Sequence, residues 1–292
     1  MYGASYSSWS IVSESWGVLR RNKTLVVFPI ISGIACLFVA ASFLAPLVLS
    51  PEIRRTALTW FEDEANGNLT PQAQLGLTLG VFAFYFANYF VIVFCNTALA
   101  ACALLSFEGD EPTVATGLSI ATARLPHILG WSLLAATVGM VLKAIEERTD
   151  LVGSIVTGLL GLAWTAATAL VVPVLVVEKL GPLDALKRST SLLRDCWGTG
   201  LRGNFRLGLA GLIINLPGAF LVVGGIMLGV ENNSIVPVVI GCGVGVTYLI
   251  AAAVVLTTVK QIFLAGLYYY AVQRRVPAGF SADAMKGAFQ RK

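Results

Sequence analysis

The chain has 292 residues, of which 57% are hydrophobic and only 12% are charged, and its mean hydropathy is +0.79. Soluble domains typically carry about 25% charged residues, so this composition excludes an ordinary soluble fold and predicts that the bilayer is the solvent. The net charge is +4, and His127 is the single histidine, which excludes a metal site built on several histidines.

Residues 2–22 open the chain as an amphipathic helix that we expect to lie at the membrane surface. One helical face gathers its large apolar side chains, Tyr2, Trp9, Val12, Trp16 and Leu19. Arg20 and Arg21 follow at the end of this helix, where they suit the headgroup region. A helix packed against the protein's own bundle is the alternative interpretation.

Six apolar runs are predicted to cross the membrane, whose hydrocarbon core is about 30 Å thick. They are residues 25–49, 75–107, 128–142, 151–177, 207–230 and 235–259. Pro173 is expected to kink the fourth run near its end. Lys260 follows the sixth run. Three tyrosines, residues 268–270, then suggest a surface-lying extension, followed by a polar tail at 274–292.

Two further surface helices are predicted, a weak one at 112–125 and a strongly amphipathic, basic one at 182–198. Pro182 and Asp184 favour a helix start. The apolar face of the second helix carries Leu183, Leu186, Leu193 and Trp197. Its basic side chains are expected to face anionic headgroups, where each is worth roughly 1 kcal/mol.

The same pattern of a surface helix, Trp-Gly, a basic exit and a crossing occurs twice, at Trp16-Gly17 and at Trp197-Gly198. With the weaker helix at 112–125, the chain is predicted to contain three units, each a surface helix followed by two crossings. Residues 1–292 then form a single integral membrane domain. The predicted fold class is therefore all-α, a polytopic transmembrane bundle of six crossings with internal repeats.

Charge orients this bundle. With both termini on one side, that side holds sixteen of the twenty Lys and Arg residues. Basic residues are enriched in cytoplasmic segments. We therefore expect the termini and the surface helices to lie on the cytoplasmic side of a cell membrane.

Few polar side chains interrupt the crossings. Asn88, Asn96 and Asn215 lie inside apolar runs, where each amide needs a hydrogen-bond partner. Contacts between helices are the first interpretation, and a path for a polar solute is the alternative. Glu178, at the end of the fourth run, is the one carboxylate singled out. It is expected to pair with Lys179, Lys187 or Arg188, and a headgroup or substrate contact is the alternative.

Several short motifs resemble a family of prokaryotic integral membrane proteins with six helices and no assigned function. They are Ser15 to Arg20, Phe28-Pro29, Ala163-Trp164, Val172 to Val174, Glu178, Gly181-Pro182, Ala185 to Ser189, and Trp197-Gly198. The resemblance implies a prokaryotic cytoplasmic membrane and supplies no catalytic residues. Ala185 to Ser189, Tyr268 to Ala271 and Pro277 to Phe280 are also similar to the membrane domain attached to some glycerophosphodiester phosphodiesterases. The catalytic domain of those enzymes has no counterpart here.

The sequence contains none of the common nucleotide-binding, hydrolase or metalloprotease motifs. We therefore expect a non-enzymatic membrane organiser or accessory protein, without cofactor, metal or nucleic acid. Its expected partners are the bilayer and its anionic headgroups, and a protein partner or a second copy of the chain. Candidate contact residues are Trp16, Arg20, Arg21, Lys187, Arg188, Arg194 and Trp197. The alternative is a facilitated transporter of a neutral or lipid-like solute, lined by Asn88, Asn96 and Asn215.

Overall fold

The computed structural model describes residues 3–147, 151–195, 197–283 and 285. Over these residues the chain is helical and forms no strand. Among them, six helices are long and apolar enough to cross a membrane. The predicted fold class, an all-α polytopic membrane protein, is confirmed.

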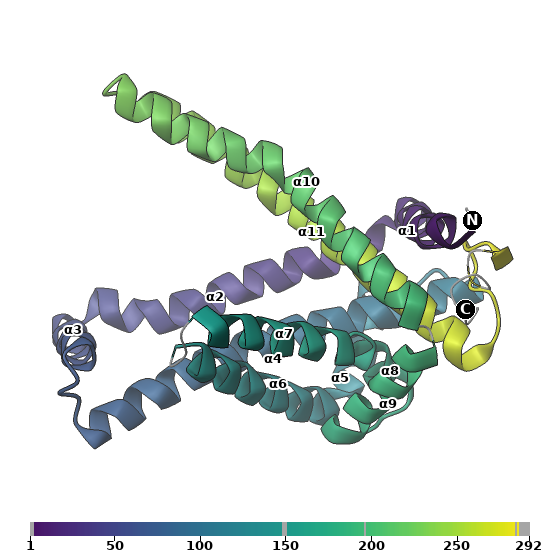
Figure 1. Cartoon of the computed structure of the whole chain (residues 1–292), viewed down its shortest axis with the longest axis horizontal. Coiled ribbons are helices and arrows are strands. Elements are labelled where there is room, and N and C mark those ends of the chain that lie inside the picture. The colour runs from purple at the N-terminus through teal and green to yellow at the C-terminus, as the bar shows by residue number, and fades with distance from the viewer. Residues whose placement is uncertain (1–2, 148–150, 196, 284, 286–292) are drawn as a thin grey trace.

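The helices follow one another along the chain as Figure 1 labels them. They are α1 (Gly3–Arg21), the 3₁₀ turn η1 (Lys23–Val26), α2 (Val27–Leu49), α3 (Pro51–Ala65), α4 (Pro71–Glu108), α5 (Val114–Ala123), α6 (Leu125–Glu146), α7 (Leu151–Ala167), α8 (Val171–Val177), α9 (Pro182–Asp195), α10 (Trp197–Glu231) and α11 (Ile235–Gln273).

A short helix precedes a pair of long segments three times along the chain. The groups are α1 with α2 and α4, α5 with α6 and α7–α8, and α9 with α10 and α11. Each short helix packs on the last segment of another group: α5 on α4, α9 on α8, and α1 on α11. Each group therefore contacts the next one in the chain, and the third group contacts the first.

The compact core lies at the end of the molecule where both chain termini are found (Figure 1). There the C-terminal halves of α4 and α11 pack against each other and against α8. Residues 97–104 of α4 and 261–269 of α11 are buried without interruption. Phe107 packs edge-on against Tyr269, with ring centroids 5.8 Å apart, which aligns the two helices.

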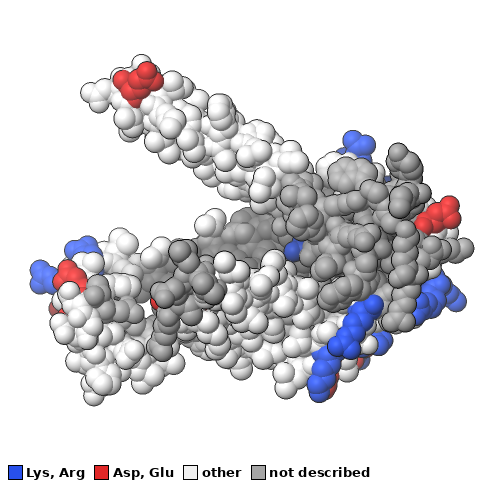
Figure 2. Space-filling model, viewed as in Figure 1, with Lys and Arg blue, Asp and Glu red and all other residues white. Residues whose placement is uncertain are grey.

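Most exposed large apolar side chains lie beyond this core, on α2, the first part of α4, α6, α7 and the α10–α11 hairpin. They form the surface that a bilayer would cover. The hairpin diverges from the other long helices (Figure 1), and Figure 2 shows an open wedge beside it. From 235 to 257, only Gly241 and Gly245 of α11 are buried, and their close neighbours lie on α10.

The expected helix ends are corrected at several places. The second crossing extends to Pro71–Glu108 and the third to Leu125–Glu146, while the surface helix expected at 112–125 spans Val114–Ala123. The fifth crossing, expected at 207–230, is part of a helix that begins at Trp197. The surface helix expected at 182–198 therefore ends at Asp195.

The sixth crossing, expected at 235–259, lies within a longer helix. Helix α11 continues to Gln273, so Lys260 lies inside it. Tyr268 and Tyr269 are buried in the core and do not lie on a surface extension. The tail is also less polar than expected over its described part, because Phe280 is buried and packs on Phe107, with ring centroids 5.6 Å apart.

The short helices pack on the core through only part of the expected apolar stripes, and the other stripe residues are exposed. In α1, Val18 and Leu19 are buried, whereas Trp16 is exposed. In α9, the small Ala185 is buried and Leu183 is exposed. The two Trp-Gly pairs also differ in position: Trp16-Gly17 lies inside α1, whereas Trp197-Gly198 begins α10.

Candidate functional site

The fourth membrane segment consists of two helices, α7 and α8, and a side chain of α9 hydrogen-bonds the backbone between them. Pro173, in the first turn of α8, has no N–H to donate to the carbonyl four residues earlier, and its ring disfavours a continuous helix there. The chain turns at 168–170 between α7 and α8. The expected kink at Pro173 is thus a complete interruption.

Ser189 of α9 supplies the hydrogen bonds that this break removes. Its Oγ donates to the Ala167 carbonyl at 2.7 Å and accepts from the Leu170 N–H at 3.1 Å. Ser189 is fully buried, so water cannot take the place of its hydroxyl as the hydrogen-bond partner of these two backbone groups. A buried backbone group without a partner costs about 1–3 kcal/mol, so the hydroxyl is a structural necessity of the break.

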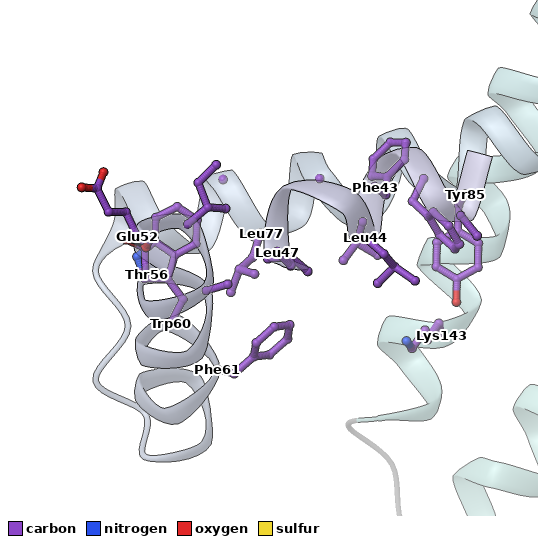
Figure 3. A pocket seen from close by; sticks show the side chains of 17 residues that line it. Phe43, Leu44, Leu47, Glu52, Thr56, Trp60, Phe61, Leu77, Tyr85 and Lys143 are labelled. Carbon is purple, nitrogen blue, oxygen red and sulfur yellow. Dashed lines mark hydrogen bonds between the residues drawn. The ribbon is translucent and has the colours of Figure 1, made fainter. Parts of the chain in front are cut away.

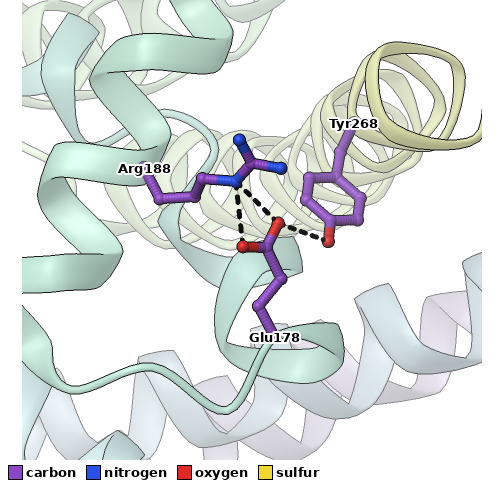
Figure 4. A network of polar contacts seen from close by, with 3 residues as sticks. All are labelled: Glu178, Arg188 and Tyr268. Carbon is purple, nitrogen blue, oxygen red and sulfur yellow. Dashed lines mark hydrogen bonds and ion pairs between the residues drawn. The ribbon is translucent and has the colours of Figure 1, made fainter.

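Glu178 joins three elements just after α8. Its carboxylate accepts from Nε of Arg188 in α9 at 3.0 Å and 2.9 Å, and from the Tyr268 hydroxyl in α11 at 3.0 Å (Figure 4). The expected pairing of Glu178 with one of the nearby bases is present, and the partner is Arg188. Both carboxylate oxygens are engaged, so Glu178 acts here as a structural link.

The last turn of α8 has a further contact. Arg124, just before α6, donates from Nε to the Val176 carbonyl at 3.0 Å. A cation suits the C-terminal end of a helix, where carbonyl groups lack partners within the helix. The two ends of α8 are therefore held by side chains from other elements, Ser189 at one end and Arg124 at the other.

The motif at residues 185–189 now has a physical account. Ala185 is buried and small, Arg188 pairs with Glu178, and Ser189 seals the helix break. Lys187 points away, with an exposed side chain and a 3.6 Å contact to Asp184. Three bases of α9 were expected to bind headgroups. Arg188 instead pairs with Glu178, whereas Lys187 and Arg194 are exposed.

The candidates on α1 lie on its outer face. Trp16 and Arg20 are exposed, and the Arg20 guanidinium lies 5.9 Å from the Trp16 ring centroid, a cation–π contact. Arg21 is exposed as well. The side chain of Trp197 lies outside the described residues. The candidates therefore fall into two groups, one on α1 and one on α9.

The three asparagines do not come together. Asn88 and Asn215 each donate to a carbonyl of their own helix, those of Phe84 at 2.9 Å and Gly211 at 2.7 Å. Asn96 shares α4 with Asn88 and is half-buried. Asn215 lies on α10, which packs on α11, α1 and α9. These placements give no support to a common polar path.

Two residues at this site were not expected to take part in it, Tyr268 and Ser189. The run of three tyrosines at 268–270, close to the basic Arg274 and Arg275, favours a surface extension rather than a buried position for Tyr268. Residues 261–273 contain no proline and no charged residue, which indicates that the helix continues. No local signal links Ser189 to Ala167, because that contact depends on how α9 folds back.

The six long apolar helices within the described residues define a polytopic α-helical membrane protein. Residues 76–280 match the family of unknown function DUF6159, and the chain belongs to this family. No curated protein and no solved structure matches the chain. The similarity to the membrane domain of glycerophosphodiester phosphodiesterases receives no support from these comparisons.

Proposed function

We propose that this protein is a non-enzymatic membrane protein that binds anionic lipid headgroups through the basic face at its terminus-bearing end. One observation carries the proposal. Exposed bases gather at that end, next to the apolar surface that a bilayer would cover (Figure 2): Arg20, Arg21, Lys23, Lys179, Lys187, Arg194, Arg274 and Arg275. The tip of the α10–α11 hairpin, in contrast, carries Glu231.

The chemistry of this face suits headgroups. Exposed ion pairs such as Lys187–Asp184 contribute little to stability, so Lys187 remains free to exchange its partner for a phosphate. Several bases along one membrane surface add their attractions to anionic lipid. We also propose that this end faces the cytoplasm, where anionic lipids and basic segments both occur.

The test uses the full-length protein in native lipid discs. Reversing two exposed charges, Lys187→Glu with Arg194→Glu, removes about 2 kcal/mol of attraction, which is more than tenfold in affinity for anionic lipid. The matched control is Arg54→Glu with Arg55→Glu, an exposed basic pair on α3 at the opposite end. Mass spectrometry of the co-purified lipids measures the ratio of anionic to zwitterionic species.

The expected result is a lower anionic fraction in the α9 variant and an unchanged fraction in the α3 variant. Equal fractions in wild type and the α9 variant would contradict the proposal. A protein or a second copy of the chain that co-purifies reproducibly, and is lost with the same two charges, would assign this face to a protein partner instead.

A further inference from the structure

A groove of about 930 Å³ lies at the end of the molecule away from the termini. Its walls come from the C-terminal part of α2 and the first part of α4, and α3 lies across their ends (Figures 1 and 3). Ligand pockets are typically about 300–1,000 Å³, so this groove is at the upper end of that range.

The lining is almost entirely apolar. Aromatic and aliphatic side chains form the walls: Phe43, Leu44 and Leu47 of α2, Leu77 of α4, and Trp60 and Phe61 of α3 (Figure 3). Phe43 and Phe84 close one side in an edge-to-face pair, with ring centroids 5.5 Å apart. Glu52 and Lys143 are the charged residues among those that line the groove.

Two glycines of α4 make room in this groove. A Cβ atom at Gly76 would lie 3.3 Å from the Trp60 ring, so Trp60 packs directly over the helix backbone. A Cβ atom at Gly80, one turn on, would meet nothing within 4 Å. The space above Gly80 therefore belongs to the groove itself, and a larger side chain there would fill it without a clash at its first atom.

One end of the groove carries a cation. The Lys143 Nζ lies 6.0 Å from the ring centroid of Tyr85, which also lines the groove. Its ion pair with Glu147 is long, at 3.6 Å, and both side chains are more than half exposed. Such a pair is weak, so an anionic group competes for Lys143 at little cost.

We propose that this groove binds an anionic phospholipid, with its acyl chains between α2 and α4 beneath α3 and its phosphate at Lys143. The helices α2 and α4 are among those long and apolar enough to cross a membrane, which favours hydrocarbon over water as the medium at their apolar faces. An apolar wall with one cation at its end matches a hydrocarbon chain that carries an anionic head. This site is separate from the basic face of α1 and α9.

The experiment maps where a lipid's chain touches the protein. Full-length protein is reconstituted in vesicles that contain phosphatidylglycerol with a diazirine in its acyl chain, and irradiated. Cross-linked peptides are then identified by mass spectrometry. We expect cross-links concentrated on the groove-lining segments, residues 40–61 and 76–85. Cross-links spread evenly over the exposed faces of α10 and α11 would overturn the proposal, because they would indicate bulk lipid only.

Gly80→Leu is the decisive variant, because leucine fills the groove and also favours the helix more than glycine does. The matched control is Gly158→Leu on α7, where a Cβ atom likewise meets nothing within 4 Å and no groove residue is altered. We expect a several-fold loss of groove cross-links in the first variant and none in the second. Undiminished groove cross-links in Gly80→Leu would overturn the proposal.

Lys143→Gln tests the headgroup. The same cross-linking is repeated with phosphatidylcholine that carries the identical chain. Wild type should cross-link more with the anionic probe than with the zwitterionic one, and Lys143→Gln should remove that preference. An anionic preference that survives this substitution would refute the assignment of the phosphate to Lys143. Reversal of Lys187 and Arg194 should leave the groove cross-links unchanged, which separates this site from the basic face.

Discussion

At the scale of single residues, we expect stability to depend most on the polar side chains that hydrogen-bond backbone groups without a partner in their own helix. Ser189 is fully buried and bonds both a carbonyl and an N–H at the α7–α8 break. Glu178 instead links side chains on α9 and α11, and Arg188 is partly exposed. The serine is therefore expected to matter more for stability than the ion pair, because solvent screens the latter.

Ser189→Ala should lower the free energy of unfolding by about 2 kcal/mol, because the buried Leu170 N–H and the half-buried Ala167 carbonyl both lose their partner. Ser191→Ala is the matched control, since Ser191 lies on the same helix with an exposed side chain. Thermal unfolding of the full-length protein in detergent, followed by circular dichroism, measures both. Similar midpoints for the two variants would show that the break does not depend on Ser189.

The sequence predicted the Glu178 pair because an acid and several bases lie close together along the chain. It did not predict Tyr268 as the third member, since ninety residues separate Tyr268 from Glu178. Trp16 illustrates the same limit. The sequence places Trp16 and Leu19 on one apolar stripe, but Leu19 is buried, whereas Trp16 is exposed and pairs with Arg20.

At the scale of elements, the α7–α8 break and α9 form one unit. The break at 168–170 leaves the Ala167 carbonyl and the Leu170 N–H without partners in the helix, and Ser189 satisfies both. Pro173 favours the break because it has no N–H to donate and its ring disfavours a continuous helix. Proline in a membrane helix is tolerated where a neighbouring side chain restores the missing hydrogen bonds. The effects of Pro173→Ala and Ser189→Ala on the free energy of unfolding should therefore not be additive.

A double-mutant cycle tests this coupling. Pro173→Ala restores an N–H and permits a continuous helix, so Ser189→Ala should cost less in that background than in wild type. We expect a coupling energy of about 1 kcal/mol, within the range seen for groups in one network. Thermal unfolding of the four proteins gives the value. Strictly additive penalties would mean that the break persists without Pro173.

At the scale of the whole molecule, the compact core and the apolar surface lie at different ends. The core gathers α4, α8, α9 and α11 near the termini, whereas the α10–α11 hairpin extends away from it (Figure 1). The hairpin is held by its own close packing: a Cβ atom at Gly241 would lie 2.6 Å from the Gly225 Cα. Such small-residue contacts suit helices whose other faces meet lipid.

The proposed orientation predicts which ends can be labelled from outside a cell. With the five native cysteines replaced, Lys187→Cys should resist a membrane-impermeant thiol reagent in intact cells and react after permeabilisation. Asn68→Cys, between α3 and α4, should react in both cases, since Asn68 is exposed. The reverse pattern would place the basic face outside the cytoplasm and contradict the proposed headgroup contact on that side.

The sequence by itself determined the solvent of this protein, its all-α class and most of its six apolar helices, because composition and run length respond directly to the hydrocarbon core. It also indicated a kink at Pro173 and a pairing of Glu178 with a nearby base, whereas the complete interruption of the fourth segment appears only in the structure. Only the tertiary structure decided that Ser189 seals the break, that Tyr268 completes the Glu178 link, and that α2, α3 and α4 enclose an apolar groove. These features depend on contacts between residues far apart in the chain, whose approach is set by side-chain packing and leaves no periodic signal in any one segment.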